Sequence, residues 1–199
     1  HLASRQLEYD RDRSQAEWLH IAAVDTARFV LALNAKTTTA EDSLTEAWAI
    51  PLTDTKVSDF LRGVDIPQEL SQLSRMGQVS DAQSRFNLNN LVDTESGRRI
   101  DPDGLFVFQA LLGNIGVDRG LAHQVANQLA NTGFKFTDAA QLEGFEGFNP
   151  NLLQRLRSLV TALPERTKIN VNTASSDVLR AVFQGMNAGQ AASFITART

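Results

Sequence analysis

The longest uninterrupted pattern in this chain is helical and occupies residues 2–34. No Gly or Pro interrupts that stretch, and a set of its positions recurs at steps of three and four, the period of an amphipathic helix. The recurring residues are Leu19, Ala23, Thr26, Val30 and Leu33. At about 1.5 Å of rise per residue, one helix of that length would extend about 50 Å. The sequence therefore predicts a single long helix at the start of the chain.

The first half of this helix differs from the second in composition. Between residues 5 and 17 charged side chains predominate, and only Leu7 and Tyr9 can bury a large apolar surface. We therefore expect this half to protrude from its own domain or to lie against another subunit. The pattern leaves one alternative open, an exposed helix stabilised by charge pairs three and four residues apart.

Shorter elements are expected after the long helix. Residues 40–48 and 57–61 are interpreted as short elements on either side of a turn at Pro51. Farther along, Phe86 and Leu88 alternate with two asparagines. This alternation puts the apolar pair on one face and the asparagines on the other, as in a half-buried strand. It predicts a sheet beside the long helix.

The second half of the chain reads as mainly helical. From Pro102 the helical pattern continues almost to the end, and the strand-like residues 169–172 interrupt it. The change of composition near Ile100 is the best internal boundary. We therefore expect two regions, residues 1–100 and residues 101–199.

A short motif recurs three times in the helical half. Glycine, an apolar residue and Asp or Asn follow one another at 116–118, 147–149 and 185–187. Glycine permits the positive φ that ends one helix, and the apolar residue enters the core. Asp or Asn then caps the following helix by accepting a hydrogen bond from a free amide. Three similar helical hairpins are therefore predicted.

The last of these hairpins, within residues 168–198, has the element order of a helix-hairpin-helix module. Such modules either hold a nucleic-acid backbone through hairpin amides or pack as small protein-binding bundles. The chain has a net charge of -4 and a pI near 5.4, and Asp118 places a negative charge in one hairpin. Only Arg180 and Arg198 are cationic between residues 169 and 199. These charges favour protein binding over a nucleic-acid partner.

Catalytic and metal-binding patterns are sparse. The histidines His1, His20 and His123 have no partner at a recognisable spacing, and neither a nucleophile elbow nor a phosphate-binding glycine loop occurs. Residues 101–104 (DPDG) resemble the start of a calcium loop, but Leu112 stands where the bidentate glutamate should be. A capped turn that opens a helix is expected there. The absence of cysteine excludes disulfides and thiol catalysis. We predict that the protein is not an enzyme.

Composition indicates a globular protein. Apolar residues make up 42% of the chain, enough to bury a core, and no apolar run approaches the roughly 20 residues of a membrane-spanning helix. The abrupt start at His1, without an initiator Met, suggests an excerpt of a longer protein.

Four segments, in this order, resemble one protein family. They are the long N-terminal helix, residues 42–48 (DSLTEAW), residues 81–91 (DAQSRFNLNNL) and residues 168–198, which begin KINVNTA. The chain resembles the K-type minor pseudopilins of bacterial type II secretion (general secretion pathway protein K, GspK) over most of its length. The resemblance implies an α+β fold in which a long N-terminal helix packs on a small antiparallel sheet, as in type IV pilins. A large inserted helical domain with helix-hairpin-helix or SAM-like modules completes it.

The resemblance also implies a function. Members of the family lie at the tip of the periplasmic pseudopilus, where they initiate and cap its assembly for protein export. Their partners are the minor pseudopilins of I and J types, which they bind through N-terminal helices. An inner-membrane anchor is implied as well, formed by an N-terminal membrane helix that is not present in this chain. The candidate contacts with a partner or with the sheet are Leu7, Trp18, Leu19, Ala22, Ala23, Thr26, Phe29 and Val30.

The chain departs from the family pattern at two places. Family members usually carry an acidic segment associated with calcium where this chain passes from Asn131 to Thr132, and no helix cap is recognisable at that junction. We therefore expect residues to be absent there, and calcium binding rests on the resemblance alone. The family also continues past Thr199 into strands that complete its sheet. The alternative from a different class is a competence-type DNA-binding module, whose helix-hairpin-helix has a similar N-x-N-T-A start.

Overall fold

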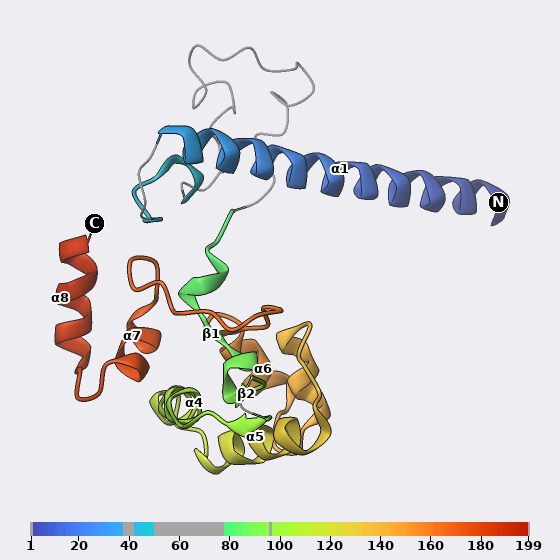
Figure 1. Cartoon of the computed structure of the whole chain (residues 1–199). Helices are drawn as coiled ribbons and strands as arrows, with labels where there is room; N and C mark the ends of the chain where they lie inside the picture. Colours follow the sequence, from blue (N-terminus) through green and yellow to red (C-terminus); the bar gives the residue numbers. More distant parts are fainter. Residues whose placement is uncertain (1, 38–41, 50–77, 96, 199) are drawn as a thin grey trace. The chain divides into compact units, whose positions relative to one another are not determined.

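The structure is a computed structural model that describes residues 2–37, 42–49, 78–95 and 97–198. It divides into two compact units, His1–Ser80 and Asp81–Thr199, which we call unit 1 and unit 2 (Figure 1). The turn predicted at Pro51 and the element predicted at residues 57–61 lie outside the described residues.

Unit 1 is dominated by the predicted long helix, α1 (Leu2–Thr37). Its other described element is a short 3-10 helix, η1 (Ala47–Ala49). The two are joined through a buried carboxylate, because Asn34 Nδ2 donates to Glu46 Oε2 at 3.0 Å and the Trp48 indole N–H donates to the same oxygen. The sheet predicted beside this helix is not seen in the described part of unit 1, where no strand occurs.

Unit 2 holds the remaining elements. They are η2 (Ala82–Ser84), β1 (Phe86–Asn87), η3 (Leu88–Leu91), β2 (Val92–Asp93), β3 (Arg99–Ile100), α4 (Pro102–Asn114), α5 (Gly120–Thr132), η4 (Ala139–Gly144), α6 (Pro150–Leu156), β4 (Val160–Thr161), α7 (Ser176–Val182) and α8 (Ala188–Arg198). The second half is thus helical, as predicted, and the fold is helix-rich with small sheets. No described helix has the length and apolar content to cross a membrane.

The two sheets are small and differ in direction. β1 and β4 are parallel, with Phe86 opposite Val160, and β2 and β3 are antiparallel, with Val92 opposite Ile100. The sequence predicted one antiparallel sheet. The parallel pair was not foreseen because its strands are joined by more than seventy residues that include α4, α5 and α6.

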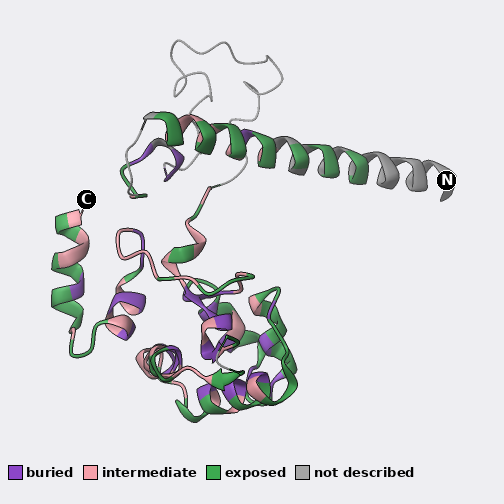
Figure 2. Cartoon of the chain, in the orientation of Figure 1, coloured by how far each residue is buried: buried purple, intermediate pink, exposed green. Residues whose placement is uncertain are grey.

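The core of unit 2 lies between α4, α5, α7 and the segment that contains β1 and η3 (Figure 2). Phe86 stacks on Phe108 with ring centroids 5.8 Å apart, and Leu88 and Leu91 are fully buried. Unit 2 therefore begins at Asp81, earlier than the predicted boundary near Ile100, because these residues belong to the same core as the helices.

The strand predicted at residues 85–89 is only partly correct. Strand pairing ends after Asn87, and residues 88–91 form η3. Asn87 and Asn89 were expected on an exposed face, yet they are 1% and 8% exposed. The prediction was wrong because alternating apolar and polar residues show only that two faces differ. They cannot show that other segments of the chain cover the face that carries the asparagines.

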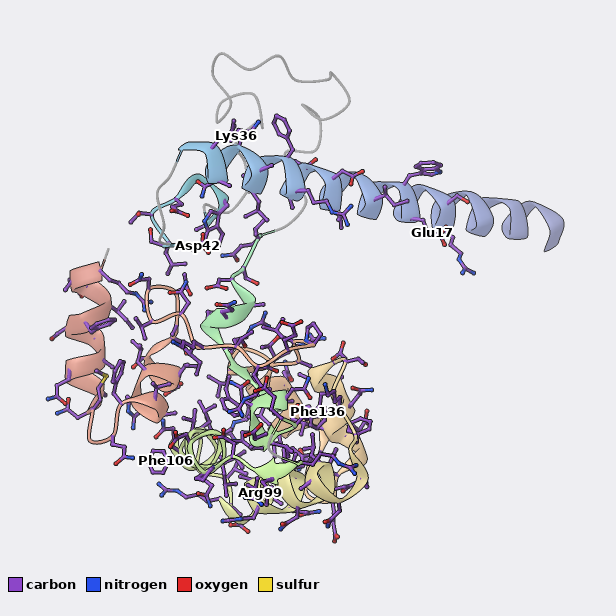
Figure 3. The ribbon with its side chains drawn as sticks, in the orientation of Figure 1. Glu17, Lys36, Asp42, Arg99, Phe106 and Phe136 are labelled. Atoms are coloured by element: carbon purple, nitrogen blue, oxygen red, sulfur yellow. The ribbon has the colours of Figure 1, made fainter. Side chains whose placement is uncertain are left out.

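Those partners are backbone groups from distant segments. Asn87 Nδ2 donates to Glu165 O at 2.7 Å. Asn89 Nδ2 donates to Phe136 O, and the Phe136 N–H donates back to Asn89 Oδ1, both at 2.9 Å. Phe136 itself is buried (Figure 3). Leu163 joins the network, because its N–H donates to Asn87 Oδ1 at 3.1 Å. The asparagines thus hold residues 136 and 163–165 to the segment that contains β1 and η3.

The strand predicted at residues 169–172 is also wrong. Asn170 Oδ1 accepts from the Asn172 N–H at 3.0 Å, and Asn170 O accepts from the Ala174 N–H at 3.0 Å, so the segment turns. Asp81 Oδ2 accepts from Asn170 Nδ2 at 2.9 Å and from Thr173 Oγ1 at 2.6 Å. The N-x-N-T motif therefore fastens the start of unit 2 to the loop before α7.

The three glycine hairpins are confirmed in their backbone geometry. Gly116, Gly147 and Gly185 have φ of 70°, 90° and 82°. α5, α6 and α8 follow these turns, while the element before the second turn is the 3-10 helix η4 instead of an α-helix.

The junction at Asn131 and Thr132 has a cap, contrary to expectation. α5 runs through both residues, and Gly133 ends it with φ of 69° and an N–H that donates to Leu129 O at 2.9 Å. A left-handed glycine directly after a helix is a common end signal. Absence of residues at this junction stays a prediction.

Candidate functional site

Much of the described part of α1 is exposed (Figure 2), and several of its exposed residues have large apolar side chains. Trp18 is 72% exposed, and four others are 41% to 53% exposed: Ile21, Val24, Phe29 and Leu31. Single exposed apolar residues are ordinary on protein surfaces, but a group of them on one element marks a contact surface. This surface is the strongest candidate for a functional site in unit 1.

The exposed residues fall on two sides of the helix. With about 100° of rotation per residue, Trp18 and Phe29 lie nearly in line, as do Val24 and Leu31 on the other side. We call these the Trp18 lane and the Val24 lane. Between them lies an ion pair of Arg28 and Asp25, Nη1 to Oδ1 3.1 Å, with Ile21 beside it. The helix therefore offers two exposed apolar lanes on different sides.

The third side of α1 is covered. Thr26 is 4% exposed, and Ala23 and Val30 are half-buried. This side is the amphipathic stripe that the sequence predicted. It is used within the chain, which leaves Trp18 and Phe29 as the predicted contact residues that solvent reaches.

The other predicted contact residues are less informative. The side chains of Leu7, Leu19 and Ala22 lie outside the described structure. Three exposed residues were not predicted, namely Ile21, Val24 and Leu31. Ile21 and Val24 are three residues apart, and Val24 and Leu31 are seven apart, so their helical period could have been detected. The stripe that contains Thr26 has the same period, and the prediction followed that stripe.

The ion pairs on α1 account for some of its charged residues but not for its exposed apolar residues. Arg13 Nε lies 3.3 Å from Glu17 Oε1, and Arg28 forms the pair with Asp25; all four side chains are more than 60% exposed. Such pairs stabilise an isolated helix by about 0.3–0.5 kcal/mol each. They fit the alternative of a charge-stabilised exposed helix, yet they give no reason for the exposed Trp18 and Val24.

The hairpin amides of unit 2 are already bonded within the chain. Asp118 Oδ1 accepts from the Gly120 N–H at 2.8 Å, Asn149 Oδ1 from Leu152 at 2.9 Å, and Asn187 Oδ1 from Gln190 at 2.9 Å. The caps predicted at Asn149 and Asn187 are confirmed, whereas the N-cap of α5 is Arg119, which makes no side-chain cap bond, so the cap predicted at Asp118 is wrong. A nucleic-acid phosphate would have to displace these acceptors.

The two cations near the last hairpin are engaged as well. Arg180 Nη1 lies 3.4 Å from Asp177 Oδ1, and Arg198 donates to the Val171 carbonyl. Burial lowers the pKa of the Arg198 guanidinium from its ordinary value. Arg180 thus forms its ion pair within α7, and Arg198 joins α8 to the loop before α7.

The DPDG segment forms the capped turn that the sequence predicted. Asp101 Oδ1 accepts from the Gly104 N–H at 2.8 Å at the start of α4, and the Asp101 carboxylate pairs with Arg166. Burial disfavours the charged carboxylate, but the Gly104 and Arg166 hydrogen bonds outweigh it and lower the pKa of Asp101. Within the described residues, no cluster of three or more His, Cys, Asp or Glu could hold a metal ion.

Comparison with known proteins gave consistent matches. Two family models described as type II secretion system, protein K, match residues 84–133 and residues 169–199. The type II secretion system protein K of Pseudomonas aeruginosa is 31% identical over 188 residues, which cover 79% of this chain and 50% of that protein. The chain thus spans about half the length of this curated relative.

A solved structure has a similar fold. It is a chain in the crystal structure of the GspK-GspI-GspJ complex from the type II secretion system of enterotoxigenic Escherichia coli. The TM-score is 0.63 with 21% sequence identity, over 88% of this chain and 69% of that chain.

Proposed function

This chain belongs to the protein K family of bacterial type II secretion, and from that premise we propose that it is part of a minor pseudopilin that acts by protein–protein contact. The observation that carries the proposal is the pair of exposed apolar lanes on α1. A helix whose covered side is already used inside its own unit gains stability by burying these lanes against other subunits.

The partners we propose are the minor pseudopilins of I and J types. The structural relative was crystallised as a GspK-GspI-GspJ complex, and two lanes on separate sides of α1 match two partners. The further details that we propose are a pilin-like arrangement for unit 1, helix-hairpin-helix or SAM-like hairpins for unit 2, and a position at the pseudopilus tip that initiates and caps assembly. The proposed location is the periplasm, next to the inner membrane, and the proposed role is not enzymatic.

No contact described above favours the DNA-binding alternative. The hairpin amides that would hold a phosphate already donate to Asp118, Asn149 and Asn187. An acidic chain without a free cationic patch at these hairpins lacks the counterion release that drives such binding.

The proposal is tested by mixing the chain with its I and J partners. Light scattering should show a stoichiometric complex. A mixture that contains separate monomers and no complex would overturn the proposal. Phe29→Glu on the Trp18 lane should weaken the complex at least tenfold, about 1.4 kcal/mol, because a charge would replace a buried ring. Phe106→Glu in unit 2 is the matched control, since Phe29 and Phe106 are both 41% exposed. Equal affinity of the two variants would show that the lane is not the interface.

A further inference from the structure

A seam with a seven-residue period runs along the exposed part of α1. It consists of Ile21, Val24, Arg28, Leu31 and Ala35. These residues follow one another at steps of three and four, so they lie within about 80° of one another around the helix. Ile21, Val24 and Leu31 are 53%, 49% and 42% exposed, and Ala35 is exposed as well. The seam thus contains the Val24 lane and is open to another molecule.

Arg28 is the only charged residue of the seam. Its Nη1 donates to Asp25 Oδ1 at 3.1 Å, and the side chains of Arg28 and Asp25 are 75% and 61% exposed. A guanidinium carries five N–H donors, and within the described residues the bond to Asp25 is the only one that the Arg28 side chain makes. Most of its donors are therefore free to meet an acceptor from another molecule.

The seam fits a second helix better than an extended segment. The backbone groups of α1 are hydrogen-bonded within the helix, so a partner meets its side chains. Apolar side chains that recur about every 3.5 residues form the knobs and holes into which a neighbouring helix packs. From Ile21 to Ala35 the seam is about 21 Å long at 1.5 Å per residue, which is about four turns.

Burial of the seam would enclose the Arg28 guanidinium between the apolar positions 24 and 31. A buried charge that lacks a partner is strongly destabilising, and Asp25 meets only one of the five donors. Carboxylates are the best acceptors for a guanidinium, because they can accept two parallel N–H bonds from it. A partner helix therefore needs an Asp or Glu that faces Arg28, with apolar residues on either side of that acid.

A second copy of α1 does not meet this requirement. In a parallel pair the two Arg28 side chains would face each other, because equivalent positions are opposed, and their like charges would repel. In an antiparallel pair Arg28 would meet Val24 or Leu31 and would remain without an acceptor. The charge on the seam thus favours a different subunit over self-association.

We propose that Arg28 is a specificity-determining residue of α1, and that it selects a partner subunit whose helix carries an acidic residue within an apolar seam. This inference rests on the proposed function and names the chemistry of one of the two partners. Arg28 also fixes the register of the two helices, because only one alignment brings the acid to the guanidinium. A helix without the acid is rejected, since it would bury an unpaired charge.

Arg28→Leu tests this inference because it makes the seam more apolar while it removes the guanidinium. We expect it to weaken the complex with the I and J partners at least about tenfold in isothermal titration calorimetry, since the partner's acid would be buried without its cation. Unchanged or tighter binding would overturn the inference, because a seam that binds through apolar contact alone gains from leucine.

Two further variants separate partner selection from folding. Leu, Lys and Arg have similar helix propensities, so α1 is preserved in each variant at position 28. Arg28→Lys keeps the charge but loses the planar fork, so it should bind more tightly than Arg28→Leu. Arg99→Leu, at an exposed position of β3 in unit 2, is the matched control and should leave the affinity unchanged. Equal losses for Arg28→Leu and Arg99→Leu, or for leucine and lysine at position 28, would contradict the inference.

The outcomes also separate this inference from the proposed function. If the unaltered chain forms the complex and Arg28→Leu binds equally well, α1 still assembles but Arg28 does not select its partner. If the unaltered chain forms no complex, the proposed function fails and this inference fails with it.

Discussion

Unit 2 and α1 differ in how far they bury their apolar side chains. In unit 2, aromatic and aliphatic residues from α4, α5, α7 and η3 meet in one core, and Phe108, Leu111 and Val125 are fully buried. On α1, Trp18 and Val24 remain exposed. The hydrophobic effect acts on both. Unit 2 encloses a core within the chain, although Phe106, Phe134 and Phe183 remain 40–41% exposed, whereas Trp18 on α1 is 72% exposed. The difference supports the proposal that α1 binds other subunits, while unit 2 folds around its own core.

The largest effect is expected when an aromatic ring is removed from each region. Phe108→Ala in α4 should lower the free energy of unfolding by about 3–5 kcal/mol, because a cavity replaces a side chain that is 0% exposed. Phe29→Ala on α1 should change it by no more than about 0.5 kcal/mol. Urea denaturation of both variants measures the difference. Similar losses of unfolding free energy would show that Phe29 is packed within the chain and does not lie on an open surface of α1.

A second test concerns polar groups inside unit 2. Asn89→Ala would leave the Phe136 N–H and the carbonyls of Phe136 and Leu163 without their partner. The expected loss is about 2–3 kcal/mol, because unsatisfied buried groups cost about 1–3 kcal/mol each.

Asn90→Ala is the matched control for that test. Asn90 is half-buried and bonds only to Thr167, through contacts of 2.7 and 3.2 Å, so its loss should be about 1 kcal/mol. Thermal unfolding of the two variants gives the comparison. A cost for Asn90→Ala as large as that for Asn89→Ala would contradict the role of burial.

A third and smaller effect is expected at the start of unit 2. Asp81→Ala removes the cap of η2 together with the bonds to Asn170 and Thr173, and should cost about 1–2 kcal/mol. Asp138→Ala removes only a local cap, that of η4, and should cost about 1 kcal/mol or less. If calorimetry ranks these variants in the reverse order, Asp81 does not fasten the loop before α7.

The smallest effect depends on pH. The pKa of Asp101 is lower in the folded chain than its ordinary value of 3.8. Its charge therefore stabilises the fold above that value, and this stability is lost as the pH falls through the lower folded pKa. Asp101→Asn keeps the helix cap but loses the charge, so its melting temperature should lie below that of the unaltered chain at neutral pH. The gap should narrow in circular dichroism melts as the pH falls below 3.8 and through the lower folded pKa. A gap that is constant with pH would exclude the charge as its cause.

Local features of the fold could be predicted from the sequence, while its long-range pairings could not. The turns at Gly116, Gly147 and Gly185 followed from residues within a few positions of one another. Burial of Asn87 and Asn89 could not be predicted, since their partners lie dozens of residues away. The same alternation of apolar and polar residues occurs in a half-buried strand and in a segment that is buried on both faces.

The long helix was predicted from the sequence, but the sides of that helix were not distinguished. The absence of Gly and Pro and the helical period identified α1, and Trp18 and Phe29 were predicted as contacts with a partner or with the sheet; the structure leaves both exposed. The sequence also nominated Thr26, which the structure buries. Two apolar stripes share this helix, and periodicity cannot say which of them the chain itself covers.

The sequence by itself determined the three glycine turns and several helix starts, because these depend on residues within a few positions of one another. It also determined the family, through short motifs in a fixed order. Only the tertiary structure decided which asparagines are buried and which sides of α1 remain exposed. Those outcomes depend on contacts between residues far apart in the chain, and such contacts exist only after the chain has packed.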